Sequence, residues 1–156
     1  MKAKRIGKWL MVMFVISVCF ASFAPAEEEK HIMLTPADLK WGDAPTVAPG
    51  AKIAVIEGNM KEAAPFTIRL KLPAGTKLPP HTHPAVERVT VISGALYLGM
   101  GEKSEPKNAK RLGTGSVAIM QVGTKMFAFT KKETTIQLHG TGPWGINYLE
   151  TGDAPK

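Results

Sequence analysis

The sequence is nearly free of cysteine and has only four histidines. The single cysteine, Cys19, lies near the N-terminus, so the rest of the chain can form no disulfide and offers no thiolate to a metal. A metal site would have to use histidine, carboxylate or methionine. Dense basic clusters are also missing, because no run of Lys and Arg after residue 26 is longer than the pairs at 110–111 and 131–132. This excludes the basic face that DNA or RNA binding requires.

Long helical patterns are absent as well, since no segment of ten residues after residue 26 keeps a 3.6-residue period. The chain has 156 residues, 44% of them hydrophobic and 21% charged, which suits one globular domain. Turn signals from Gly and Pro separate short runs rich in Val, Ile, Thr and aromatic residues. These runs predict strands over 66–72, 88–92, 95–98, 116–121, 125–130, 134–138 and 146–149. The fold class is therefore all-β, a sandwich or barrel, with a polar loop over 101–111.

The first 26 residues have the pattern of a signal peptide. Residues 1–8 are basic, residues 9–24 are apolar and uncharged, and a small-x-small cleavage box ends at Ala26. The apolar run is short for a membrane span of ~20 residues, which leaves an uncleaved anchor as the alternative. Lipid attachment at Cys19 is disfavoured by the branched Val18 before it. We expect a periplasmic or secreted mature protein without a stable membrane anchor.

Most of the positive charge belongs to this leader. It holds four of the 20 Lys and Arg residues, and the remaining 16 face 13 acidic residues, so the net charge falls from +7 to +3 on cleavage. Residues 27–49 begin with three glutamates and continue through Thr35-Pro36, where Thr35 can cap a short turn. We predict that 27–49 is an arm outside the core and that 50–156 is the barrel domain.

The segment around His81 and His83 carries the clearest chemical signal. On a strand, a His-x-His pair places both imidazoles on one face, with Cα atoms about 6.8 Å apart. Glu87 follows beyond the turn at Pro84 and can complete a face of two histidines and one carboxylate, typical of non-haem iron sites. The alternative is a pair of surface histidines beside a proline turn.

The glycines around this segment add a family resemblance. The string Gly75-x5-His81-x-His83-x3-Glu87-x6-Gly94 matches the first motif of the cupin superfamily position for position. Residues 51–150 thus resemble a small single-domain bacterial cupin of the type-2 conserved barrel. The resemblance implies a jelly-roll β-barrel whose mouth holds a divalent Fe, Mn, Ni or Zn ion on His81, His83 and Glu87. It further implies oxygenase- or isomerase-like chemistry on a small organic molecule.

The second cupin motif is only partly present. Its glycines correspond to Gly115 and Gly123. Its proline, histidine and asparagine are replaced by Gln121, Met126 and Thr130. Met126 thus stands where the family has a fourth metal ligand. Four outcomes remain open: water completes the site, the Met126 thioether binds a softer ion such as copper, His139 substitutes, or no metal binds and the pocket takes an organic ligand.

Strand parity also predicts what the aromatic residues near Met126 do. If Met126 faces the cavity, Phe127 and Phe129 point away from it. Their rings would be exposed to water unless another segment packs on them. Trp41 of the arm or a second subunit could supply this packing.

The same parity applies to the strand over 134–138 and to the histidine that follows it. Gln137 and His139 share one face, and Ile136 and Leu138 share the other. We interpret the polar face as the cavity side, which makes Gln137 and His139 candidate pocket residues. His139 would then be a candidate acid or base in catalysis.

Three functions fit these observations. The first is an exported metal-dependent enzyme acting on a small organic substrate. The second is a cupin that binds or senses a small molecule or metal without turnover, and the third is a structural envelope protein that has lost its chemistry. Because cupins commonly pair, we expect a homodimer through the arm and edge strands. The substrate and the metal are left unspecified by the sequence.

Overall fold

The computed structural model describes residues 31–150. The predicted signal peptide and the first part of the arm lie outside these residues. Regular structure between 31 and 150 is almost entirely β, apart from two 3₁₀ turns, η1 (Pro36–Asp38) and η2 (Pro106–Asn108). The strands are β1 (Gly42–Asp43), β2 (Lys52–Glu57), β3 (Pro65–Leu72), β4 (Lys77–Thr82), β5 (Glu87–Ser93), β6 (Ala95–Met100), β7 (Lys110–Gly113), β8 (Val117–Met120), β9 (Met126–Thr130), β10 (Thr134–Thr141) and β11 (Asn147–Tyr148). The all-β prediction is confirmed.

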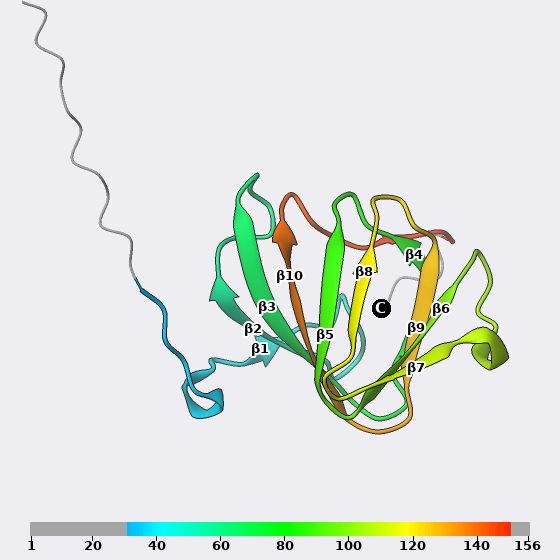
Figure 1. Ribbon diagram of the computed structural model, residues 1–156, viewed down its shortest axis with the longest axis horizontal. Coiled ribbons are helices and arrows are strands. Elements are labelled where there is room, and N and C mark those ends of the chain that lie inside the picture. The colour runs from blue at the N-terminus through cyan, green and yellow to red at the C-terminus, as the bar shows by residue number, and fades with distance from the viewer. Residues whose placement is uncertain (1–30, 151–156) are drawn as a thin grey trace, which may run out of the picture. The chain divides into compact units, whose positions relative to one another are not determined.

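The strands form two antiparallel sheets. The order is β1-β2-β3-β10-β5-β8 in the six-stranded sheet and β11-β4-β9-β6-β7 in the five-stranded sheet. Figure 1 shows β3, β10, β5 and β8 side by side in one layer, with β9, β6 and β7 in the other. Each sheet turns one face toward the core and one away from it, so side chains alternate between the two environments.

The central strands of the six-stranded sheet build much of the core. In register, Leu138 of β10 lies between Ile68 of β3 and Val89 of β5. All three are buried and belong to one hydrophobic cluster, which also contains Leu96 and Leu98 of the opposite sheet. Because apolar residues recur at every second position of these strands, they form one continuous apolar cluster between the sheets.

The arm is more closely integrated than the sequence suggests. The turn at Pro36–Asp38 forms as predicted, and the Thr35 backbone N–H donates to the Asp38 carboxylate at 2.7 Å. Further along, β1 pairs with β2, and Ala44 and Ala48 are buried in the core cluster. The expectation that the arm stays outside the core is therefore wrong for its second half, where alanines are small enough to pack against the sheet.

Four strands lie outside the predicted runs, namely β1, β2, β4 and β7. The loop predicted over 101–111 ends at residue 109. In β7 only Leu112 is buried, so this strand carries almost no apolar periodicity. No helix within residues 31–150 is long and apolar enough to cross a membrane.

Candidate metal centre at the mouth of the barrel

His81 is a buried residue of β4 with a defined tautomer. Its Nδ1 lies 2.6 Å from the carbonyl oxygen of Pro79. Because a carbonyl can only accept, Nδ1 carries the ring proton and the neutral ring keeps a lone pair on Nε2. Burial lowers the pKa of His81, against the opposing effect of the Pro79 hydrogen bond. The imidazole is thus held neutral, the form that binds metals.

His83 follows β4 directly and is held in the same way by a distant segment. Its Nδ1 donates to the Gly145 carbonyl at 2.7 Å, and its ring stacks on Trp144 with centroids 4.8 Å apart and planes at 13°. Burial lowers the pKa of His83 to about 4. Its Nε2 is buried and has no hydrogen-bond partner among the described residues. A buried polar atom without a partner is costly unless something binds it.

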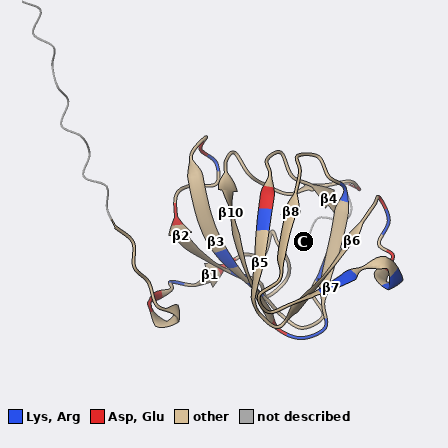
Figure 2. Ribbon diagram, viewed as in Figure 1, with Lys and Arg blue, Asp and Glu red and all other residues tan. Residues whose placement is uncertain are grey.

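Glu87 begins β5, where Figure 2 shows an acidic band followed by a basic one. It shares the inward face of the strand with the core residues Val89 and Val91. Its Oε1 lies 3.4 Å from His83 Nε2. Burial raises the pKa of the Glu87 carboxyl to about 7. The His83 and Glu87 side chains are close enough to form an ion pair. Because burial disfavours the charged form of each, we take both as neutral in the metal-free protein.

These three residues are the candidate donors for a divalent ion. The rings of His81 and His83 lie edge to face with centroids 5.0 Å apart, and Glu87 contacts the Nε2 side of His83. Two imidazoles anchored through Nδ1 and one carboxylate suit Fe, Mn, Ni or Zn. Within residues 31–150, however, no group of three or more His, Cys, Asp or Glu side chains is placed so that it could hold a metal ion as it stands.

Met126 lies beside this site. It is the first residue of β9, it is opposite His81 in the β4–β9 register, and it is almost fully buried in the core cluster. A second thioether, that of Met120, belongs to the residue opposite Glu87 in the β5–β8 register. Met120 is not among the predicted site residues, although it shares the inward face of its strand with Ala118, and strand parity could have indicated this.

The C-terminal segment supplies three contacts that the sequence analysis also missed. Trp144 stacks on His83, the Gly145 carbonyl fixes the His83 tautomer, and Tyr148 lies opposite His81 with ring centroids 6.0 Å apart. The Gly- and Pro-rich composition of 140–145 pointed only to a turn. The aromatic residue within that turn was the available signal.

Gln137 and His139 face away from the barrel interior. Their neighbours Ile136 and Leu138 belong to the core cluster, so alternation puts Gln137 and His139 on the outer face of the six-stranded sheet. There Gln137 accepts a hydrogen bond from Arg69 Nε at 3.0 Å. The expectation that these two residues line the pocket, and that His139 substitutes as a ligand or acts as acid or base, is wrong for this geometry. The polar side of β10 is simply its outer side.

Phe127 and Phe129 do point outward, as strand parity predicted, but Trp41 does not cover them. Trp41 lies under the Lys71 ammonium, 4.8 Å from the ring centroid, on the six-stranded sheet. Phe129 instead stacks on Tyr97 at 4.8 Å, and Phe127 packs over Gly99.

A cavity of about 490 Å³ adjoins the candidate metal centre. Trp144, which stacks on His83, lines it together with the core residues Ile68 and Leu70 and with Val47 of the arm. The walls are mainly apolar, and the volume is within the range of small-molecule sites.

Comparison with known sequences identifies the family. The sequence model of the ChrR Cupin-like domain matches residues 29–106, half of the chain. The chain belongs to the ChrR cupin-like family. The match contains all three proposed ligands, and the resemblance to the cupin superfamily is confirmed. No curated protein matches the chain.

Solved structures show the same fold at low sequence identity. An acetylacetone dioxygenase from Acinetobacter johnsonii has 14% identity and a TM-score of 0.62, covering 85% of each chain. The polyketide cyclase RemF from Streptomyces resistomycificus has 11% identity and a TM-score of 0.64, covering 81% of this chain and 90% of its own. An RmlC-like cupin from Shewanella frigidimarina has 13% identity and a TM-score of 0.57, covering 73% of this chain and 93% of its own. The barrel is therefore a cupin jelly roll.

Proposed function

We propose that this ChrR-like cupin is an exported metal-binding protein that acts on a small organic molecule at the mouth of its barrel. The observation that carries the proposal is the arrangement of His81, His83 and Glu87. Both imidazoles are buried and fixed through Nδ1 by backbone carbonyls, and the free Nε2 of His83 faces the carboxylate of Glu87. Ligand histidines in proteins are oriented by this kind of second hydrogen bond.

A bound divalent ion would polarise an oxygen-bearing substrate or activate O₂, as in oxygenase- or isomerase-like chemistry. The protein's own groups prepare the position for it. The Pro79 and Gly145 carbonyls hold the histidine tautomers, and the stacked Trp144 excludes water from one side of His83. His139, on the outer face, has no part in this proposal.

The fourth ligand position is left to water, with the Met126 thioether as neighbour. Thioethers prefer soft ions and carboxylates prefer hard ones, so Glu87 and Met126 do not suit the same metal equally. We therefore propose Fe, Mn, Ni or Zn with Met126 as packing, because methionine fills irregular space in a barrel interior well.

The substrate proposal rests on the cavity beside the site. Its apolar walls and its 490 Å³ suit a small organic molecule of low charge. The similar structures include a protein named for dioxygenation of acetylacetone and one named as a polyketide cyclase. These names support chemistry on small carbonyl compounds.

Elemental analysis of the mature, untagged protein tests the metal proposal. We expect close to one divalent ion per chain, and we expect His81→Ala to abolish it, because two remaining donors hold an ion weakly. His139→Ala is the matched control: it removes a histidine on the outer face and should retain the metal. Equal metal content in the two variants, or a metal-free wild type, would contradict the proposal.

A second candidate is a cupin that binds its ligand without turnover. The replacement of the family's ligand histidine by Met126 favours it, because a three-ligand site is weaker. Oxygen uptake and product analysis with small phenols, thiols and keto acids separate the two functions. Uptake that His81→Ala abolishes supports the enzyme, and binding without consumption supports the binder.

Export is a separate proposal, supported by the leader pattern in the sequence. We propose cleavage after Ala26 and a location in the periplasm or outside the cell. Mass spectrometry of the protein from the envelope fraction should find an N-terminus at Glu27. An intact N-terminus there would favour the uncleaved anchor.

A further inference from the structure

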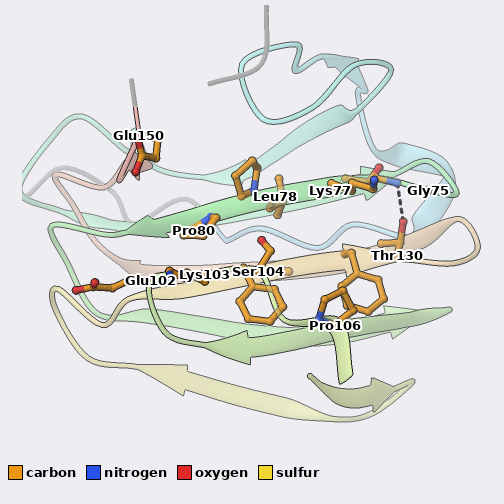
Figure 3. Close-up of a pocket in the computed structure, with 15 residues that line it drawn as sticks. Gly75, Lys77, Leu78, Pro80, Glu102, Lys103, Ser104, Pro106, Thr130 and Glu150 are labelled. Carbon is orange, nitrogen blue, oxygen red and sulfur yellow. Dashed lines mark hydrogen bonds between the residues drawn. The ribbon is translucent and has the colours of Figure 1, made fainter. Parts of the chain in front are cut away.

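A second cavity among the described residues lies outside the barrel. It measures about 730 Å³ and lies on the outer side of the five-stranded sheet, between β4, β9 and the loop that joins β6 to β7. None of His81, His83 and Glu87 lines it. Figure 3 shows Pro80 on one wall and Ser104 and Pro106 of the loop on another.

The floor of this outer pocket is aromatic and firmly held. Phe127 is buried although it faces outward, because Gly99 on β6 leaves room for its ring: a Cβ at position 99 would lie 2.2 Å from Phe127 Cζ. Phe129 stacks on Tyr97 at 4.8 Å and 10°, and the Lys131 ammonium covers the far side of Tyr97. A rigid aromatic floor favours a flat or extended apolar ligand, because little side-chain entropy is lost on binding.

The loop wall is fixed to the sheet by two contacts at its start. The Gly101 backbone N–H donates to the Lys125 carbonyl at 2.9 Å, and the Lys125 ammonium pairs with the Glu102 carboxylate. The pocket is therefore a built feature of the fold rather than a gap under a loose loop. Because Lys125 engages it, Glu102 adds little free negative charge to the pocket.

The charge of the pocket is uneven along its length. Lys77 lies opposite Phe129 in the β4–β9 register, and since Leu78 is in the core, Lys77 shares the outward face with that ring. Lys77 has no ion-pair partner among the described residues. Lys103 of the loop and Glu150 also line the pocket, and Figure 3 places both toward the opposite end, where their charges oppose each other.

From this arrangement we propose that the outer pocket is a second binding site, for a small amphipathic anion. Its apolar body would lie on Phe127 and Phe129, and its single carboxylate or sulfonate would pair with the Lys77 ammonium. This site is independent of the metal proposal, because β4 and β9 separate it from the barrel interior.

The test uses 8-anilinonaphthalene-1-sulfonate as a fluorescent anionic probe on the mature wild-type protein. We expect saturable binding of one probe per chain. Lys77→Glu should weaken it about five-fold or more, because one favourable ion contact becomes a repulsion. Lys110→Glu, an exposed lysine of β7 that does not line the pocket, should stay within two-fold. Equal effects of the two charge reversals would overturn the proposal.

Two further comparisons locate the probe and its charge preference. Ser104→Trp fills the pocket from an exposed loop position and should abolish binding, whereas Lys107→Trp on the same loop should not. The neutral N-phenyl-1-naphthylamine should bind more weakly than the sulfonate and should not respond to Lys77→Glu. Probe binding that survives Ser104→Trp, or that His81→Ala abolishes, would place the probe elsewhere and overturn the proposal.

Discussion

At Glu87 two physical tendencies oppose each other. A carboxylate is the natural partner of a divalent ion, yet its place on the inward face of β5 removes it from water and raises its pKa to about 7. The metal-free barrel therefore accommodates a group that is costly when ionised. In such a site the buried group lowers the stability of the ligand-free protein. Binding of a ligand that pairs with this group then stabilises the fold.

The residue-scale prediction for Glu87→Gln follows from linkage. A carboxyl whose pKa rises from 4.5 in the unfolded chain to about 7 in the fold costs stability as pH rises between these values, and the full cost remains above pH 7. In metal-free protein, Glu87→Gln should thus stabilise by about 3 kcal/mol at pH 8 and by little at pH 4.5. Urea unfolding at both pH values measures this. The exposed Glu133→Gln is the control, and an equal gain at both pH values would contradict the argument.

Met126 supports a second residue-scale prediction. Replacing its thioether by imidazole restores a fourth strong donor next to His81 in the register, so Met126→His should bind the metal at least ten-fold more tightly, provided His81 and His83 already hold it. Competition with a chelator measures the affinity. Met100→His places a histidine at an exposed position of the neighbouring strand and should change nothing. Unchanged affinity in Met126→His would mean that position 126 does not reach the ion.

At the scale of elements, the turn between β5 and β6 sets how the two sheets connect. The chain leaves the six-stranded sheet at Ser93 and enters the five-stranded sheet at Ala95. The single residue between them, Gly94, has φ of 78°. A glycine there lets the chain cross between sheets without a loop, which keeps the register of β5, and so the place of Glu87, fixed.

Gly94→Ala should therefore destabilise the barrel by about 2 kcal/mol or more. The added Cβ would lie 2.5 Å from the Glu133 carbonyl oxygen, at a backbone conformation that L side chains avoid. Gly42→Ala is the control, because nothing lies within 4 Å of a Cβ there. Urea unfolding measures the free energy of unfolding of both variants. If Gly94→Ala leaves this free energy unchanged, the turn can shift to accommodate the added Cβ.

The scale of elements also explains which predictions held. Alternation along β10 correctly predicted that Gln137 and His139 share a face. It could not predict which face is buried, because a period of two residues is the same for both faces of a strand. Only the packing of Ile136 and Leu138 against the other sheet decides this. The strand β7 was missed for a related reason, since one buried residue gives no period to detect.

At the scale of the whole molecule, one edge of the barrel is open to a partner. In the described part of the chain β8 pairs only with β5, and its Val117 and Ile119 are 58% and 54% exposed. Exposed edge strands with apolar side chains are prone to pair with another copy. Antiparallel pairing of β8 with its own copy would satisfy the two-fold symmetry of a dimer.

We accordingly predict a homodimer that depends on this edge. Light scattering coupled to size exclusion should give twice the mass of the mature chain. Ile119→Glu should yield a monomer, because like charges then meet across the two-fold axis. The exposed Val55→Glu, which lies on β2, is the control and should remain dimeric. A monomeric wild type would refute the dimer, and a dimeric Ile119→Glu would place the interface elsewhere.

The sequence by itself determined the all-β class, the candidate ligands and the departure at Met126. It could do so because these depend on local alternation, turn residues and short fixed spacings. The tertiary structure alone decided which neighbours complete the site. Trp144, Gly145 and Tyr148 come from a segment about sixty residues away, and the inside of each strand is defined only by what packs on it. Long-range contacts of this kind leave no periodic mark in the sequence, so they become visible only in the folded barrel.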